Sequence, residues 1–260
     1  MASDDVAPPH VPQWLIPATS AALQLGGLLW TITYILILRR AWRDKTYSMP
    51  MVAHACNVGW ELVYGLFIAK VKMEKTGFQV WLVFNLGLVY SFLKFGRNEW
   101  KHTPVIQRNL GLIFFALTAM MFGIHYSFAR WWVDNNIGIE RGKRYGDIQP
   151  GPDTTELGYW SALASQAVLG IAYVGQLLAR WDNRGSDVYI WAARTIGTAC
   201  GIYIHYGVRW WFWPEEHPYV VNPFSICLAA ICLGADLVYG VLMAQIHTQR
   251  MRRESSRKSL

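Results

Sequence analysis

Seven long apolar runs, separated by short charged segments, constrain this chain more than any other feature. The runs cover residues 17–38, 49–69, 78–95, 105–127, 157–179, 189–211 and 221–246. A helix needs about 20 consecutive apolar residues to cross the hydrocarbon core of a bilayer. Only 16% of the residues are charged, whereas soluble domains carry about a quarter. The pattern predicts an all-α membrane protein in which a single domain forms a bundle of seven transmembrane helices.

The basic residues are distributed unevenly between the two sides of this predicted bundle. Fifteen of them lie on the side of the C-terminus and eight on the side of the N-terminus, with Arg194 inside the sixth run. Because lysine and arginine favour the cytosolic side, the N-terminus is predicted to be lumenal and residues 247–260 to form a basic cytosolic tail. The predicted location is the endoplasmic reticulum membrane. The bases form no stripe on a soluble face, so the net charge of +7 does not indicate a nucleic-acid partner.

Two carboxyl groups, Glu61 and Asp236, lie well inside apolar runs. Each belongs to the pattern Gly-x-acid-Leu-Val-Tyr-Gly, at residues 59–65 and again at residues 234–240. A carboxylate is costly in hydrocarbon, so acids at this depth usually face the interior of a bundle and carry function. We therefore expect both acids to be functional residues.

Helical spacing predicts which residues accompany each acid, because positions three, four and seven apart share one face of a helix. One face of the second run combines His54, Asn57, Glu61 and Tyr64. One face of the seventh run combines Cys232, Asp236, Tyr239 and Met243. Both faces are expected to look into one interior, with the two acids at different depths and not necessarily in contact.

The chemistry expected of this interior is acid catalysis on an apolar substrate. A carboxyl that stays protonated in a water-poor site can act as a Brønsted acid, and aromatic faces stabilise cations. Glu61 and Asp236 are the candidate catalytic residues. The candidates for substrate contact or cation stabilisation are Trp60, Tyr64, Asn57, Tyr239, Asn85 and Trp210. The four cysteines contain no CxxC pair, which argues against a zinc site.

The chain resembles the small integral-membrane terpene cyclases of fungal meroterpenoid and indole-diterpene pathways. The resemblance rests on Asn-Val-Gly-Trp-Glu-Leu-Val-Tyr at 57–64, Asn-Leu-Gly-Leu-Val-Tyr at 85–90, residues 95–104, Arg-Trp-Trp-Phe-Trp-Pro at 209–214 and the segment around Asp236. It implies that Glu61 and Asp236 are the two essential acids. It also implies protonation of a terminal epoxide or alkene on a farnesyl or geranylgeranyl chain, then cationic cyclisation and proton loss. Neither a metal nor another cofactor is then expected, and the partners are the lipid bilayer and a hydrophobic prenylated small molecule.

A proton-coupled transporter is the main alternative, because transporters also use buried acids and internal repeats. A purely structural membrane protein ranks third. A retinal-binding protein is not favoured, because residues 221–246 contain no lysine for a Schiff base. The only adjacent aspartates, Asp4 and Asp5, lie in the N-terminal segment, so no aspartate-rich diphosphate motif is present.

Two further features have open interpretations. Arg194 is expected to extend to the cytosolic surface, with substrate anchoring as the alternative. The segment 128–156 is the largest predicted soluble piece. It either covers one mouth of the bundle or serves as a solvated connector.

Overall fold

The computed structural model describes residues 3–145 and 150–258, with side chains as far as residue 251. Within these residues every regular element is helical. The long helices are α1 (Leu15–Asp44), α2 (Met51–Val63), α3 (Lys72–Phe95), α4 (Pro104–Asp134), α5 (Thr154–Arg180), α6 (Val188–Thr198) and α8 (Pro223–Lys258). The remaining ones are the π-helical segments η1 (Tyr64–Ile68) and η4 (Ala199–Val208), the short helix α7 (Arg209–Phe212), and the 3₁₀ turns η2 (Gly96–Asn98), η3 (Ile139–Arg141) and η5 (Pro218–Val221).

Among the described residues, six helices are long and apolar enough to cross a membrane. They correspond to all the predicted spans except the sixth. The predicted span 189–211 is helical, but it is divided between α6, the π-helical η4 and α7. Four ends differ from the predicted ones by six residues or more: α1 ends at Asp44 rather than at 38, α3 begins at Lys72 rather than at 78, α4 ends at Asp134 rather than at 127, and α8 continues past 246 to Lys258.

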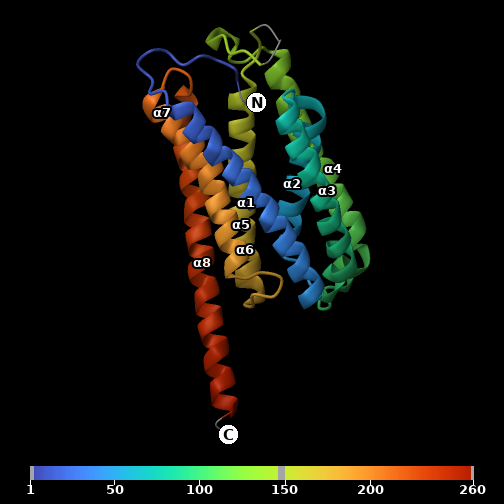
Figure 1. Ribbon diagram of the computed structural model, residues 1–260. Coiled ribbons are helices and arrows are strands. Elements are labelled where there is room, and N and C mark those ends of the chain that lie inside the picture. Colours follow the sequence, from blue (N-terminus) through green and yellow to red (C-terminus); the bar gives the residue numbers. More distant parts are fainter. Residues whose placement is uncertain (1–2, 146–149, 259–260) are drawn as a thin grey trace.

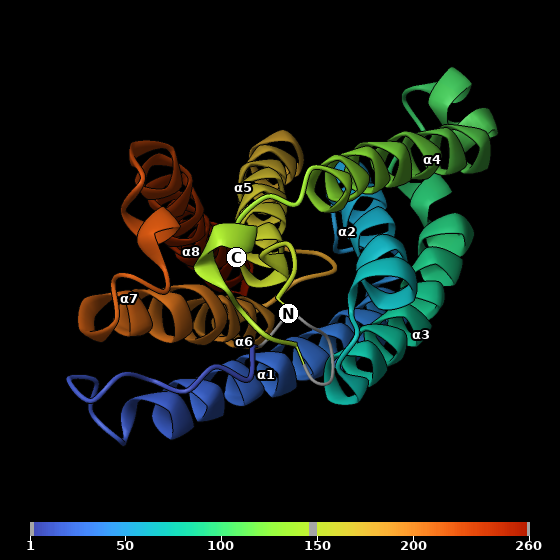
Figure 2. The same ribbon diagram turned by 90° about the horizontal axis from the view of Figure 1, so that it is seen from above.

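The helices form a bundle in which sequence neighbours do not always pack together (Figures 1 and 2). Helix α1 lies against α3 and against α6 with η4, whereas α2 lies between α4 and α5. Helix α8 packs on α5. The first and last described residues lie at opposite ends of the bundle. This arrangement brings α1, α2 and α3 together on one side of the interior, and α5, α6 and α8 on the other.

A glycine allows α2 and α4 to approach closely. A Cβ atom at Gly59 would lie 2.8 Å from the backbone nitrogen of Phe122 and 3.0 Å from the carbonyl carbon of Met121. Real Cβ atoms do not reach such distances from backbone, so a larger residue would push the two helices apart. The glycine two residues before Glu61 thus fixes the position of the helix that carries this acid.

The loop between α4 and α5 folds over one end of the bundle and packs on the N-terminal segment. The backbone nitrogen of Asp4 donates to the carbonyl of Arg144 over 2.9 Å, and the Arg144 nitrogen donates to Asp5 Oδ1 over 3.1 Å. Gly138, with φ of 80°, turns the chain against Asp153. The described part of this loop therefore forms a cap over one end of the bundle; residues 146–149 of the predicted segment 128–156 lie outside the described residues.

Buried ion pairs hold the cap together. The Lys143 ammonium is fully buried, 2.7 Å from Asp153 Oδ2 and 3.5 Å from Glu216 Oε1. Asp153 also caps the N-terminus of α5 by accepting from the Glu156 nitrogen, and it bonds to Arg141 at 3.1 Å. Each of these charges thus has a partner of opposite sign, which offsets the cost of burying it.

Glu216 should make the stability of the cap depend on pH. Burial raises the pKa of this carboxyl from 4.5 to about 7, although Lys143 opposes the shift. The folded state holds this proton more tightly than the unfolded state, so Glu216 contributes stability fully below pH 4.5 and loses that contribution as the pH rises through 7. The wild-type protein should therefore lose thermal stability between pH 4.5 and pH 7 through Glu216. We expect the Glu216→Gln variant to lack this loss.

The neighbouring Glu215 provides the control, because its side chain is 67% exposed. Burial lowers the pKa of His217 to about 2. His217 therefore contributes to the stability of the folded state above pH 6.5, and this contribution declines as the pH falls. The pH dependence is opposite to that of Glu216. Melting temperatures of Glu216→Gln, Glu215→Gln and wild type in detergent at each pH separate the two effects. Parallel curves for wild type and Glu216→Gln would contradict the assignment.

Candidate functional site

The buried carboxyl of Glu61 is the centre of a polar cluster formed by three helices. Its Oε1 accepts hydrogen bonds from the Tyr34 hydroxyl of α1 over 2.5 Å and from Asn57 Nδ2 of α2 over 3.2 Å. Its Oε2 accepts from Asn85 Nδ2 of α3 over 2.6 Å. Asn57 also donates to the Tyr34 oxygen over 2.5 Å. We call Tyr34, Asn57, Glu61 and Asn85 the Glu61 cluster.

The surroundings of Glu61 contain hydrogen-bond donors but no cation. Glu61 is 0% exposed, and among the described residues no arginine, lysine or histidine pairs with it. The three donors occupy lone pairs of the carboxyl oxygens. The neutral acid carries one O–H that it can donate, and in the carboxylate the same three donors stabilise the negative charge. The cluster therefore suits a group that releases a proton.

Four aromatic rings extend from the Glu61 cluster towards the capped end. The Trp60 ring lies 4.9 Å from Phe78 and 5.4 Å from Tyr64, and Phe78 lies 5.7 Å from Trp81. Phe78 and Trp81 share a face of α3 with Asn85, because they are seven and four residues before it. The Trp60 indole is held by a 3.0 Å hydrogen bond to Ser161 of α5. We call these four rings the aromatic wall.

Asp236 has a different environment, because it is paired with an arginine. Arg194 Nη2 lies 2.5 Å from Asp236 Oδ1, and both side chains are largely buried. The guanidinium carbon lies 4.1 Å from the Tyr173 ring centroid and 5.2 Å from that of Tyr239. The expectation that Arg194 extends to the surface is therefore wrong: the arginine is 2% exposed. A charge this deep is retained because the carboxylate compensates it.

Both polar groups adjoin one apolar cluster. Tyr34 contributes its hydroxyl to Glu61 and its ring to this cluster, and Tyr173 and Tyr239 contribute the rings that flank Arg194. The members of the cluster are Tyr34, Ile37, Met49, Ala53, Leu88, Leu169, Tyr173, Leu177, Ile190, Tyr239, Met243 and Ile246. The two acids thus lie on either side of a shared apolar centre and make no hydrogen bond with each other among the described contacts.

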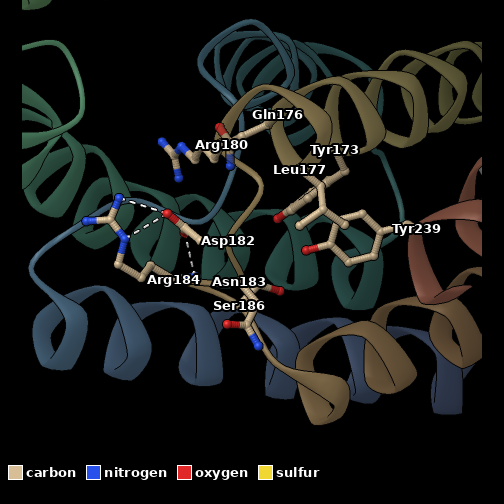
Figure 3. Close-up of a pocket in the computed structure, with 9 residues that line it drawn as sticks. All are labelled: Tyr173, Gln176, Leu177, Arg180, Asp182, Asn183, Arg184, Ser186 and Tyr239. Carbon is tan, nitrogen blue, oxygen red and sulfur yellow. Dashed lines mark hydrogen bonds and ion pairs between the residues drawn. The ribbon is translucent and has the colours of Figure 1, made fainter. Parts of the chain in front are cut away.

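A narrow cleft leads from the uncapped end of the bundle to the two tyrosines (Figure 3). It is lined by Tyr173, Gln176, Leu177, Arg180, Asp182, Asn183, Arg184, Ser186 and Tyr239. The cleft lies at the connection between α5 and α6, where Arg184 bonds to Asp182 over 3.0 Å. Its inner wall therefore consists of the same rings that cover the Arg194 guanidinium.

The structure brings most of the predicted site residues together. Asn57, Asn85 and Glu61 are in direct contact, Trp60 and Tyr64 lie in the aromatic wall, and Tyr239 lies beside Arg194. Trp210 is not part of this arrangement: it lies on α7, and its ring contact is with Trp211, 6.1 Å away.

Sequence reasoning missed Tyr34 and Tyr173 and misplaced Arg194. Tyr34 lies in the first apolar run, where a tyrosine is as readily a packing residue as a hydrogen-bond donor. Arg194 gave a usable signal, because a buried carboxylate requires a compensating cation. The partner of Asp236 could have been sought among the bases inside the spans, of which Arg194 lies farthest from a span end.

Comparison with known proteins places the chain in a family. Residues 3–249 match the Pyr4-like transmembrane terpene cyclases. The terpene cyclase ascF of Acremonium egyptiacum is 34% identical, over 96% of this chain and 90% of its own length. The Pyr4-family terpene cyclase mfmH of Annulohypoxylon moriforme is 31% identical, over 93% and 92%. The terpene cyclase paxB of Penicillium paxilli is 30% identical, over 90% and 88%. No solved structure shows significant similarity to the chain.

The chain belongs to the Pyr4-like transmembrane terpene cyclases. It is therefore an integral, multi-pass membrane enzyme of terpenoid metabolism. This membership confirms the resemblance seen in the sequence, and it favours a cyclase over a proton-coupled transporter as the explanation of the two buried acids.

Proposed function

We propose that this cyclase opens the terminal epoxide of a prenyl chain with a proton from Glu61. The observation that supports the proposal is the Glu61 cluster: a fully buried carboxyl that accepts three hydrogen bonds and has no basic partner among the described residues. A neutral acid in such a site keeps its O–H for the substrate. After proton transfer, Tyr34, Asn57 and Asn85 stabilise the carboxylate without rearrangement, which is how preorganised donors lower a barrier.

The reaction is an isomerisation in which every proton is accounted for. The Glu61 O–H bond breaks as the epoxide oxygen takes the proton and its C–O bond opens. The cation adds to neighbouring double bonds, forms rings and loses a proton from carbon to a base, and one proton returns to the Glu61 carboxylate, so substrate and product have the same formula. Two rings of the aromatic wall, Trp60 and Tyr64, lie one and three residues from Glu61 along the chain, and the other two lie on α3. Its ring faces suit cationic intermediates, each contact contributing ~0.5–2 kcal/mol.

The substrate class follows from the family and from the apolar interior. We propose a farnesyl or geranylgeranyl chain attached to a meroterpenoid or indole-diterpene precursor, with a terminal alkene as the alternative to the epoxide. Acid initiation needs no metal or other cofactor. The apolar cluster between the two acids supports the prenyl chain as the buried part of this substrate.

We propose further that the composite of α6, η4 and α7 is the seventh span, with the cap lumenal and α8 ending in the cytosol. The 15 bases on the side of the C-terminus support this orientation, and the endoplasmic reticulum is the matching membrane. A C-terminal reporter found inside sealed microsomes would contradict it.

The proposal is tested with membranes that contain the full chain. We expect epoxidised farnesyl- or geranylgeranyl-bearing phenols or indoles to give products of unchanged mass and altered retention, both with and without a chelator. The matched non-epoxidised substrates distinguish epoxide opening from alkene protonation. Loss of turnover with the chelator and its return with magnesium would contradict acid initiation. Failure to convert any prenyl substrate in folded, inserted protein would contradict the proposed reaction.

A further inference from the structure

The ion pair between Arg194 and Asp236 distinguishes the two acids of this enzyme. Arg194 is the cation within 2.5 Å of the Asp236 carboxylate, and the pair lies in the interior between α6 and α8. Attraction between opposite charges is strong where the surroundings are apolar, so the arginine favours the ionised form of its partner. The Glu61 carboxyl is bound by three neutral hydrogen-bond donors, where Asp236 is bound by an arginine. The two acids are therefore in opposite charge environments.

Neighbouring groups hold this pair in one geometry. The Tyr173 and Tyr239 rings lie 4.1 Å and 5.2 Å from the guanidinium carbon. The Trp191 indole donates to the carbonyl of Asp236 over 2.9 Å and ties α6 to α8 at this level. The rings restrict the rotamer of Arg194, and the indole fixes the backbone that carries the carboxylate.

The pair is not saturated in the way expected of a structural ion pair. Nε and Nη1 of Arg194 are buried and have no hydrogen-bond partner in the part of the chain that the structure describes. Buried charges are ordinarily hydrogen-bonded throughout, because each unpaired donor is costly. An apolar pair of similar size would pack here without that cost. The arginine is therefore better explained by what it does to Asp236 than by stability.

We propose that Arg194 is a positioning residue that keeps Asp236 ionised and fixed in orientation beside the apolar cluster. The inference rests on the proposed function, since it gives the two acids separate tasks in that reaction. Glu61 is the neutral acid that supplies the proton. Asp236 is the fixed negative charge that stabilises cationic intermediates across the apolar cluster, and it does not initiate the reaction.

Infrared difference spectroscopy of the purified full-length protein tests the charge states without relying on turnover, because neutral and ionised carboxyls absorb at separate frequencies. We expect Glu61→Gln to remove a neutral-carboxyl band and Asp236→Asn to remove a carboxylate band. Arg194→Gln should create a new neutral-carboxyl band that the double variant Arg194→Gln, Asp236→Asn lacks. Arg194→Lys should leave the wild-type bands in place, because it retains the cation.

Kinetics give the second readout. We expect Arg194→Gln and Asp236→Asn each to lower kcat about 10²-fold with KM little changed, as for removal of one electrostatic group. The double variant should be no slower than either single one. Arg194→Lys should restore kcat to within about tenfold of wild type, because the positive charge is what acts on Asp236. It also serves as the folded reference if the glutamine variant accumulates poorly.

Two outcomes would overturn the inference: a neutral-carboxyl band lost on Asp236→Asn in the wild-type background, or an Arg194→Gln variant that turns over as fast as wild type. The first of these outcomes does not depend on the initiation step. If the wild-type enzyme converts no prenyl epoxide, the proposed function fails while the spectra still report the charge of Asp236. If turnover is normal and Asp236 is neutral, the proposed function stands and the role of Arg194 fails.

Discussion

Replacing Glu61 by glutamine is expected to lower the rate of cyclisation by about 10²–10⁴-fold, the usual contribution of general acid catalysis. The amide retains the size of the carboxyl and can still accept the bonds from Tyr34 and Asn57, so the bundle should remain intact. It lacks an acidic proton, and the apolar surroundings offer the epoxide no other donor of comparable strength. Product formation from a prenyl epoxide, normalised to inserted protein, measures the effect.

Glu140→Gln is the matched control, because it makes the same change at an exposed position of the cap. It should turn over at the wild-type rate. Near-wild-type turnover by a correctly inserted Glu61→Gln variant would exclude Glu61 as the initiating acid.

Replacing Lys143 by methionine is expected to destabilise the cap by ~3–5 kcal/mol, the cost of removing one partner from a buried ion pair. Methionine approximates the length of the lysine side chain, so the effect comes from the lost ammonium, which leaves Asp153 with Arg141 alone and removes the ion-pair partner of Glu216. Both charged groups are fully buried, and water cannot replace the lost ammonium without opening the cap. A lower melting temperature and faster proteolysis between α4 and α5 are the measurable consequences.

Arg144→Met provides the comparison, because the adjacent arginine is exposed and contributes backbone hydrogen bonds to the cap. It should change the melting temperature little. Equal effects of the two substitutions would indicate that the cap depends on overall charge rather than on the buried pair.

The repeated pattern around the two acids shows what the sequence could predict and what it could not. Periodicity placed His54, Glu61 and Tyr64 on one buried face, and all three are at most 1% exposed. The same argument buried Cys232, Asp236, Tyr239 and Met243. Yet the two acids, embedded in nearly identical segments, have opposite surroundings. Those surroundings come from other helices, which a local pattern does not specify.

Depth along the bilayer could have identified the pair missed at Asp236. Arg194 is six residues into α6, or ~9 Å from the uncapped end at 1.5 Å per residue. Asp236 is thirteen residues into the antiparallel α8, or ~20 Å from the capped end. In a hydrocarbon layer ~30 Å thick these depths coincide. The order of the helices around the bundle, by contrast, depends on contacts between helices, such as the close approach of α2 and α4 at Gly59. The periodicity of the sequence does not predict that order.

The projection of α8 beyond the bundle has a practical use. The helix continues without interruption to Lys258, well past the level where the other helices end (Figure 1). A soluble domain joined to α8 by a continuous helical linker would be held rigidly. In single-particle electron microscopy it would provide a feature by which images of a 29.7 kDa membrane protein can be aligned. Each residue added to the linker would rotate that domain by about 100° around the helix axis. A fusion at the other terminus would instead strain the bond between Asp4 and Arg144 that the cap requires.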